Sequence, residues 1–227
     1  MIAHSVKFKH TCLYLHLHLY LHLYLHLYLH LLLNRYAEGT GTAAKFNDIL
    51  DIKFLSSTTL ICSDLNNHCL RLLNLTGTMA ETSTYAGTCT TDGTTDGHRL
   101  HSALFRNQKY IEINNYSSTI HVFVFDGPKS LRKINLETDE VTTTARFGTY
   151  MRSMEQSGDQ LLYFSSDKKI VEFDLNSEEQ KDVAGSATKG KTTGSFDLTQ
   201  FDNARGLLLL SHEGRTVLLV ADKGNNR

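Results

Sequence analysis

The sequence lacks a dominant charge. Its 23 lysines and arginines meet 24 aspartates and glutamates, which leaves a formal net charge of -1. The chain as a whole therefore has no electrostatic attraction to phosphate groups or anionic lipid, and no nucleic-acid partner is expected.

Several other features are scarce or missing. Tryptophan is absent and proline occurs once. The motifs H-E-x-x-H and G-x-S-x-G do not occur, and neither does a glycine-rich phosphate loop. Without such a constellation, the sequence predicts no catalytic residues.

The four cysteines do not form a C-x-x-C pair, which argues against a zinc knuckle or a thioredoxin-like redox motif. Cys69 and Cys89 each lie in turn-rich sequence beside a predicted strand. They either form a disulfide or remain as two thiols buried in strands. A disulfide would imply an oxidising compartment, outside the cell or in the secretory pathway.

Residues 1–35 form a separate low-complexity segment, in which residues 13–33 alternate leucine with histidine or tyrosine. As a strand, the segment would be an amphipathic ribbon. As a helix, it would carry an imidazole stripe able to hold a divalent metal. It also has the length of a membrane anchor or degenerate export signal, and only in that case is a membrane partner expected. The remaining reading is an expanded repeat without a selected function.

The rest of the chain, residues 36–227, contains a repeated pattern. Apolar runs end in aspartate, a residue that readily starts a turn, and an alternating run follows three of them, so each unit is predicted to contain a β-hairpin. The apolar runs are residues 59–64, 122–126, 161–167 and 217–222; the runs that follow are residues 70–75, 131–136 and 170–175.

Each hairpin is followed by a third predicted strand, and glycines and a phenylalanine then open the next unit. The unit is roughly 40–60 residues long with about four strands, as expected for a propeller blade. The third strands are residues 82–86, 141–145 and 181–184; the phenylalanines are Phe46, Phe105 and Phe201.

This pattern resembles the NHL repeat, whose core is an apolar strand ending in Asp, then Asn, then Arg and an aliphatic residue. The clearest copies are SDLNNHCLR at residues 63–71 and ADKGNNR at residues 221–227. The resemblance covers about 190 residues and implies an all-β fold, an incomplete β-propeller of about four blades.

Two departures from the family accompany this resemblance. Ile49, Gln108 and Ala204 stand where the family usually has proline, so the turn there loses a pre-set φ angle. The sequence also holds fewer units than the six blades or so with which such propellers commonly close. We therefore expect a C-terminal truncation, with an exposed strand edge and an uncovered apolar face.

The residues that recur once per unit are the candidate site residues. Asp64, Asp126, Asp167 and Asp222 are expected to close turns; a ring of their carboxylates would be the place for calcium. The arginines Arg71, Arg132 and Arg227 are expected to pair with loop carboxylates or carbonyls. Both sets are scaffold residues.

The sequence therefore favours a non-catalytic scaffold that binds protein or peptide partners and carries no cofactor. One alternative is a propeller-type lyase or hydrolase that depends on zinc or calcium. Its ligands would be histidines or carboxylates, and the histidines of residues 36–227 are expected to lie at the surface. The other alternative is a truncated fragment without function.

Overall fold

The computed structural model describes residues 36–115, 119–127, 129–158, 160–196, 198–212 and 215–226. The low-complexity segment 1–35 lies outside the described residues, and so do its interpretations as a metal site, a membrane anchor or an export signal. Arg227 also lies outside the described residues. Within the described ranges, the regular structure consists of strands and three short 3-10 turns. The prediction of an all-β chain is confirmed.

The described strands form antiparallel sheets that follow one another along the chain. The first sheet has the order β1-β5-β4-β3-β2, the second β6-β10-β9-β8-β7, the third β11-β12-β13-β14 and the fourth β15-β16. The first two sheets comprise β1 (Gly39–Thr40), β2 (Ile49–Phe54), β3 (Thr59–Asp64), β4 (Cys69–Asn74), β5 (Glu81–Ala86), β6 (Gly97–His98), β7 (Tyr110–Asn114), β8 (His121–Asp126), β9 (Ser130–Asn135) and β10 (Glu140–Arg146). The other two comprise β11 (Met151–Ser157), β12 (Leu161–Ser166), β13 (Lys169–Asp174), β14 (Gln180–Gly185), β15 (Ala204–His212) and β16 (Arg215–Asp222).

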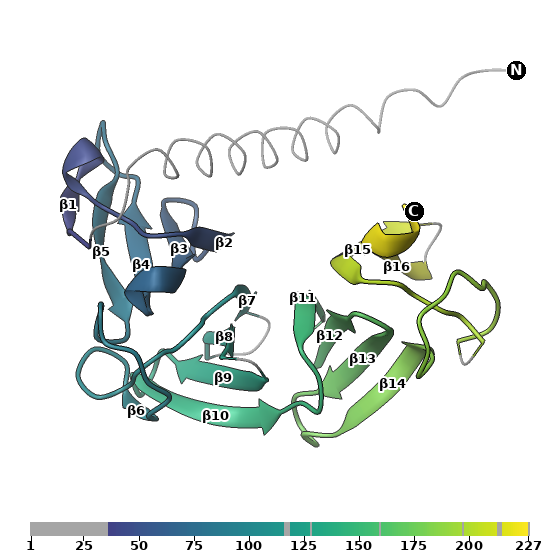
Figure 1. The fold of residues 1–227 in the computed structure, drawn as a ribbon. Helices are drawn as coiled ribbons and strands as arrows, with labels where there is room; N and C mark the ends of the chain where they lie inside the picture. Colours follow the sequence, from purple (N-terminus) through teal and green to yellow (C-terminus); the bar gives the residue numbers. More distant parts are fainter. Residues whose placement is uncertain are drawn as a thin grey trace, which may run out of the picture.

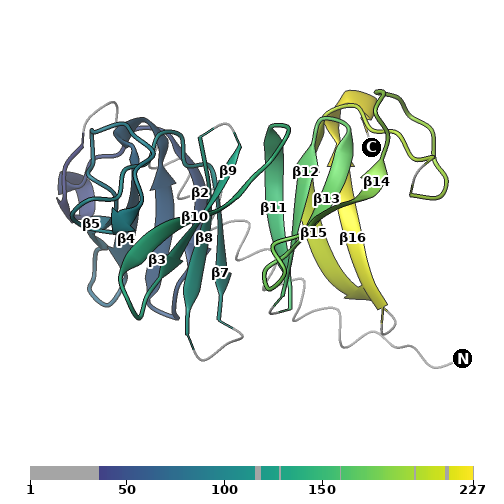
Figure 2. The same cartoon turned by 90° about the horizontal axis from the view of Figure 1, so that it is seen from below.

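The sheets are arranged around an arc, with the first long strand of each sheet on the inside (Figure 1). These inner strands touch in sequence: β2 contacts β7, β7 contacts β11, and β11 contacts β15. Seen after a turn of 90°, the axes of the long strands are roughly aligned across the sheets, while chain direction alternates within each sheet (Figure 2). The inner strands therefore form one continuous lining of the arc.

Neighbouring sheets pack face to face, which explains why the predicted apolar runs have no polar face. Ile61 of β3 and Val122 of β8 belong to one buried cluster between the first and second sheets. Phe125 of β8 and Phe164 of β12 belong to another, between the second and third sheets. Burying one such side chain contributes about 1.5–3 kcal/mol, so these clusters fix the spacing of the sheets.

Several apolar side chains of the fourth sheet are partly exposed. Leu208 and Leu210 of β15 are 38% and 37% exposed, and Leu219 of β16 is 48% exposed. In the described part of the chain, this sheet has the two strands β15 and β16. With fewer strands to pack against, its apolar residues are less covered than those of β3 or β8.

The glycine–phenylalanine segments are termed covering loops: residues 36–46, 94–105 and 191–201. In each, the backbone N–H of the residue before the phenylalanine donates to a carbonyl near the loop start. These bonds are Lys45 N to Ala37 O at 3.0 Å, Leu104 N to Thr95 O at 3.0 Å, and Gln200 N to Thr192 O at 2.9 Å. The three loops thus share this closing hydrogen bond.

The first two covering loops add a short fifth strand to their own sheets, which corrects the expectation of four strands per unit. β1 pairs antiparallel with β5, and β6 pairs antiparallel with β10. Gly97 in β6 has φ +136, and a Cβ there would lie 2.4 Å from Ser102 Oγ. Glycine is therefore required at this position. Before the third sheet, only residues 147–150 separate β10 from β11, so that sheet has no covering loop.

Candidate functional site

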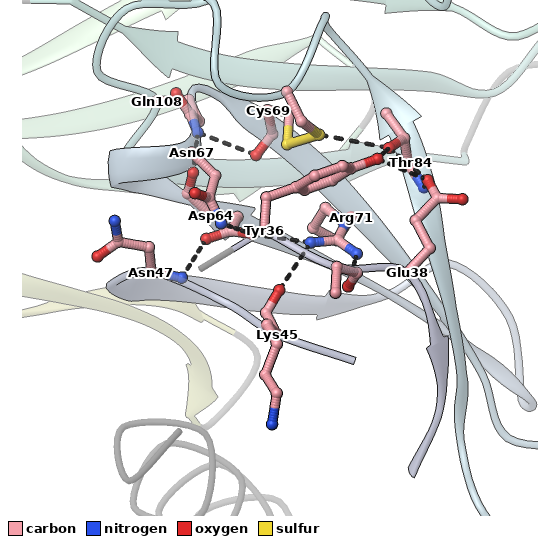
Figure 3. Close-up of a disulfide and its surroundings, with 12 residues drawn as sticks. Tyr36, Glu38, Lys45, Asn47, Asp64, Asn67, Cys69, Arg71, Thr84 and Gln108 are labelled. Carbon is pink, nitrogen blue, oxygen red and sulfur yellow. Dashed lines mark hydrogen bonds and ion pairs between the residues drawn. A yellow bond between two sulfur atoms is a disulfide. The ribbon is translucent and has the colours of Figure 1, made fainter. Parts of the chain in front are cut away.

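The recurrent aspartate and arginine of the first sheet form a buried cluster beneath the covering loop (Figure 3). Asp64 accepts hydrogen bonds from Asn47 N at 2.7 Å, from Asn67 Nδ2 at 2.9 Å and from Arg71 Nη1 at 3.0 Å. Both side chains of the ion pair are fully buried. These contacts close the turn after β3 and hold the loop onto the sheet.

Arg71 also binds the covering loop directly. Its guanidinium donates to Lys45 O at 3.1 Å and to Ala37 O at 2.9 Å. The same group lies 4.8 Å from the ring centroid of Tyr36 and 5.1 Å from that of Phe46. Two carbonyls, one carboxylate and two aromatic faces therefore surround this buried cation.

The second sheet repeats this cluster. Asp126 accepts from Arg106 N and Asn107 N, both at 3.0 Å, and from Arg132 Nη1 at 3.0 Å. Arg132 donates in turn to the covering-loop carbonyls Leu104 O at 3.0 Å and Thr95 O at 2.8 Å.

The fourth sheet keeps part of the arrangement. Asp222 is buried and accepts from Asp202 N at 2.9 Å and from Asn225 Nδ2 at 2.6 Å. Asn225 also donates to Gly190 O at 2.6 Å, just before the third covering loop. The corresponding arginine is Arg227, outside the described residues.

Asp167 of the third sheet differs, and its expected turn-closing role is not what its carboxylate does. The carboxylate pairs with Arg152 on β11, with Oδ1 2.8 Å from Nε, and its side chain is 38% exposed. Hydrogen bonding to Arg152 lowers the pKa of Asp167. The four aspartates thus lie in four separate sheets, and among the described residues no group of three histidine, cysteine or acidic side chains is placed to hold a metal ion.

Val171 occupies the place in the third sheet that arginine occupies in the first two. Without a covering loop above it, a cavity of about 580 Å³ opens over this face of the sheet. Met151 and Val171 provide its apolar floor, and Lys168, Lys181 and Asp182 line its rim. The volume falls within the range of about 300–1,000 Å³ that ligand pockets occupy.

The first and second sheets are joined near the Asp64 cluster by two side-chain contacts. Cys69 and Cys89 form a disulfide, which ties β4 to the segment leading into the second covering loop. Gln108 donates from Nε2 to Asp64 O at 2.8 Å and to Cys69 O at 2.9 Å. Gln108 is fully buried, so a buried amide secures this junction between the sheets. Cys62 is a free, buried thiol, and burial raises its pKa.

The inner strands carry a charged cluster that the sequence reading missed. Lys53 on β2 pairs with Glu112 on β7, with Nζ 2.6 Å from Oε1. Burial raises the pKa of Glu112 to about 7, although the lysine opposes the shift. Asp51 lies in the same cluster and accepts from Ile111 N at 2.8 Å through Oδ2. These polar contacts link β2 to β7.

Cations gather at the other end of the inner lining. Lys109 precedes β7, while Arg152 and Arg205 lie on β11 and β15. Burial together with the charges of these two arginines lowers the pKa of Lys109. The first strands alternate charged and apolar residues irregularly, and this is why no sequence pattern identified them.

The histidines do not form a cluster with the recurrent aspartates. His98 and His101 stack at 4.4 Å between ring centroids, at the second covering loop. His68 contacts Arg106 O through Nδ1 at 2.9 Å. These contacts are local to turns and loops.

The fold places the protein among all-β chains built from successive antiparallel sheets. No family model and no curated protein matches the sequence. Among solved structures, an auxiliary nutrient binding protein from Bacteroides ovatus ATCC 8483 is 11% identical with a TM-score of 0.49, over 84% of this chain and 57% of that chain. A structural genomics protein of unknown function from Bacteroides thetaiotaomicron VPI-5482 is 12% identical with a TM-score of 0.53, over 83% of this chain and 42% of that chain.

A second auxiliary nutrient binding protein, from Bacteroides thetaiotaomicron VPI-5482, is 10% identical with a TM-score of 0.47, over 83% of this chain and 56% of that chain. The chain therefore spans about half the length of these structures. At such identities the similarity concerns the fold alone. Within the described ranges, no helix has the length and apolarity needed to cross a membrane.

Proposed function

We propose that residues 36–227 form part of a β-propeller of NHL type, and that this propeller is a non-catalytic scaffold that binds protein or peptide partners. The repeated Asp–Arg clusters and covering loops support the family assignment, because they recur at equivalent places in successive sheets. The inward position of the first strand in each sheet supports radial stacking.

One observation carries the functional part of the proposal. The recurrent residues of the first two sheets make their contacts within the chain and are not accessible to a partner: Asp64, Arg71, Asp126 and Arg132 are at most 1% exposed. Their repetition therefore stabilises the frame. Accessible polar groups are found on the inner strands, where the Lys53 side chain is 29% exposed, and on the open face of the third sheet, where Lys168 and Lys181 are exposed, and a partner can reach both places.

The proposal includes an oxidising compartment as the protein's location. The Cys69–Cys89 disulfide supports it, because structural disulfides persist outside the reducing cytosol.

The test is selection from a displayed library of random peptides against the purified full chain, followed by fluorescence anisotropy with the recovered peptides. We expect dissociation constants in the range of about 1–100 μM, typical of small peptide contacts. Failure to recover any peptide with saturable binding would contradict the scaffold. Metal analysis of the same preparation addresses the rival lyase or hydrolase, which requires a zinc or calcium ion retained in stoichiometric amount.

A further inference from the structure

The first covering loop places a carboxylate on the outermost long strand of its sheet. Glu38 Oε1 accepts from Thr84 N at 2.8 Å and from Thr84 Oγ1 at 2.7 Å. The next residue, Gly39, pairs with Thr82 of the same strand. An acidic residue followed by glycine therefore covers the edge of β5.

The second covering loop does the same with different residues. Asp96 accepts from Thr143 N at 2.9 Å through Oδ2 and from Thr143 Oγ1 at 3.0 Å through Oδ1. Gly97 then pairs with Val141 on β10. Two sheets thus use an acid–glycine pair, antiparallel to the strand, to cover the same edge.

The third sheet has the corresponding edge without a loop on it. β14 is the last strand of this sheet, and no described strand pairs with its outer side. The registers place Arg71 opposite Thr84, Arg132 opposite Thr143 and Val171 opposite Asp182. Since backbone N–H groups alternate in direction along a strand, Asp182 directs its N–H outward, as Thr84 and Thr143 do.

The charges around this edge suit an anionic group. The carboxylate of Asp182 is paired with the ammonium of Lys169, so its negative charge is balanced. Lys168 and Lys181 are both exposed at the cavity rim. Beside them, the buried Met151 and Val171 offer an apolar surface, and Val171 stands where the first two sheets have arginine.

We propose that the open edge of β14 binds an extended peptide of a partner protein, in which an acidic residue is followed by glycine and, further along, by an apolar side chain. The peptide runs antiparallel to β14. Its carboxylate accepts the backbone N–H of Asp182 between Lys168 and Lys181, and its apolar side chain covers Met151 and Val171. This mode of binding is strand addition, and it rests on the proposed scaffold function.

The probe is a fluorescein-labelled synthetic peptide with the sequence of residues 94–105, which carries the Asp96-Gly97 pair and Phe105. Its binding to the full chain is measured by fluorescence anisotropy. A matched peptide with Asp96→Asn is the control, and we expect it to bind about tenfold more weakly, because the amide oxygen accepts a neutral hydrogen bond in place of a charge-assisted one.

Two substitutions at one position test the strand pairing. Asp182→Pro removes the outward N–H and leaves the inward ladder of β14 intact, a change that an edge strand tolerates. Asp182→Ala keeps the N–H and removes the carboxylate. We expect Asp182→Pro to weaken binding of the probe about tenfold or more, and Asp182→Ala to preserve or tighten it.

A charge reversal tests the rim independently. The double substitution Lys168→Glu/Lys181→Glu should weaken binding of the probe about tenfold. The matched pair Lys133→Glu/Lys223→Glu should leave the binding of the probe unchanged. Thermal unfolding of each variant checks its fold, and if Asp182→Pro does not fold, this double substitution decides the question.

The outcomes separate this inference from the scaffold proposal. Binding of the probe that neither Asp182→Pro nor the Lys168/Lys181 reversal alters would place the peptide elsewhere and overturn the inference. The same holds if the probe does not bind although library peptides do, and the scaffold would then stand. If neither the probe nor any library peptide binds, both the inference and the scaffold proposal would be overturned.

Discussion

The second and third sheets have their four long strands in the same antiparallel order, yet they differ at a buried position that contacts the covering loop in the second sheet. Arg132 occupies it in the second sheet and Val171 in the third, and both side chains are buried. Arg132 donates to two carbonyls of its covering loop, and the third sheet has no such loop. The comparison teaches that the arginine depends on the loop: a buried guanidinium needs those acceptors, and without them an aliphatic side chain is the stable choice.

The largest expected effect comes from breaking the cluster of the second sheet. Arg132→Ala leaves Asp126 buried without its cation and frees the loop carbonyls. We expect a loss of about 3–5 kcal/mol in the free energy of unfolding, measured by urea denaturation. Arg205→Ala, at an exposed position, is the matched control and should change little. A loss below about 1 kcal/mol for Arg132→Ala would contradict the expected cost of leaving Asp126 buried without its cation.

The pH dependence of stability tests the contact between the first two sheets at Glu112. Its pKa is raised to about 7 from 4.5, so the folded chain binds the proton more tightly than the unfolded chain does. The resulting stabilisation is fully present below about pH 4.5 and is lost as the pH rises through about 7, a change of about 3 kcal/mol.

Glu112→Gln should remove this component from the pH profile, measured as the free energy of unfolding between about pH 4.5 and 7. Glu81→Gln, on the outer strand β5, serves as the control for general charge effects. An identical slope in wild type and Glu112→Gln would contradict the expected titration.

The junction between the first and second sheets contains a covalent link, and its removal should have a similar effect. Cys89→Ser opens a disulfide with a sequence separation of 20. On loop length alone, the expected cost is about 3 kcal/mol. Reduction of the wild type should lower the urea midpoint to the same extent, and Cys62→Ser, which removes the free thiol, shows the cost of a sulfur-to-oxygen change without a bridge.

A smaller effect is expected where the covering loop meets β10. Thr143→Val removes the hydroxyl that donates to Asp96 and keeps the backbone N–H that also donates. The expected loss is about 0.5–1.5 kcal/mol in urea denaturation. Thr142→Val, the neighbouring residue on the same strand, is the control. Equal losses in both variants would mean that the Asp96 contact contributes nothing specific.

The sequence predicted the hairpins well because their signals are local. An apolar run that ends in aspartate and meets a turn has a short list of structures open to it, and the second, third and fourth strands of the first three sheets form where this pattern predicted them. The first strands were missed since Asp51 and Lys53, like Arg152 and Glu155, interrupt the apolar pattern. Their charges are accommodated by residues of neighbouring sheets, which no local pattern reports.

The differences of the third sheet from the other sheets could be predicted in part from the sequence. Its alternating run lacks the arginine, having Val171 instead, and residues 137–150 before the sheet contain no pair of glycines followed by a phenylalanine. What could not be foreseen is that Asp167 would pair with Arg152. The strand register places Ser166 where the first two sheets have Asp64 and Asp126, so Asp167 lies one residue beyond the turn-closing position.

Gln108 couples the folding of two sheets. Its amide lies fully buried in the turn that joins β3 to β4, yet it belongs to the segment that leads into β7. The turn of the first sheet is therefore complete only when the second sheet is in place, so the two should open as one cooperative unit. In native-state hydrogen exchange, amides of the two sheets should accordingly share a common protection factor, and replacing the amide by Gln108→Ala should let them exchange at separate rates.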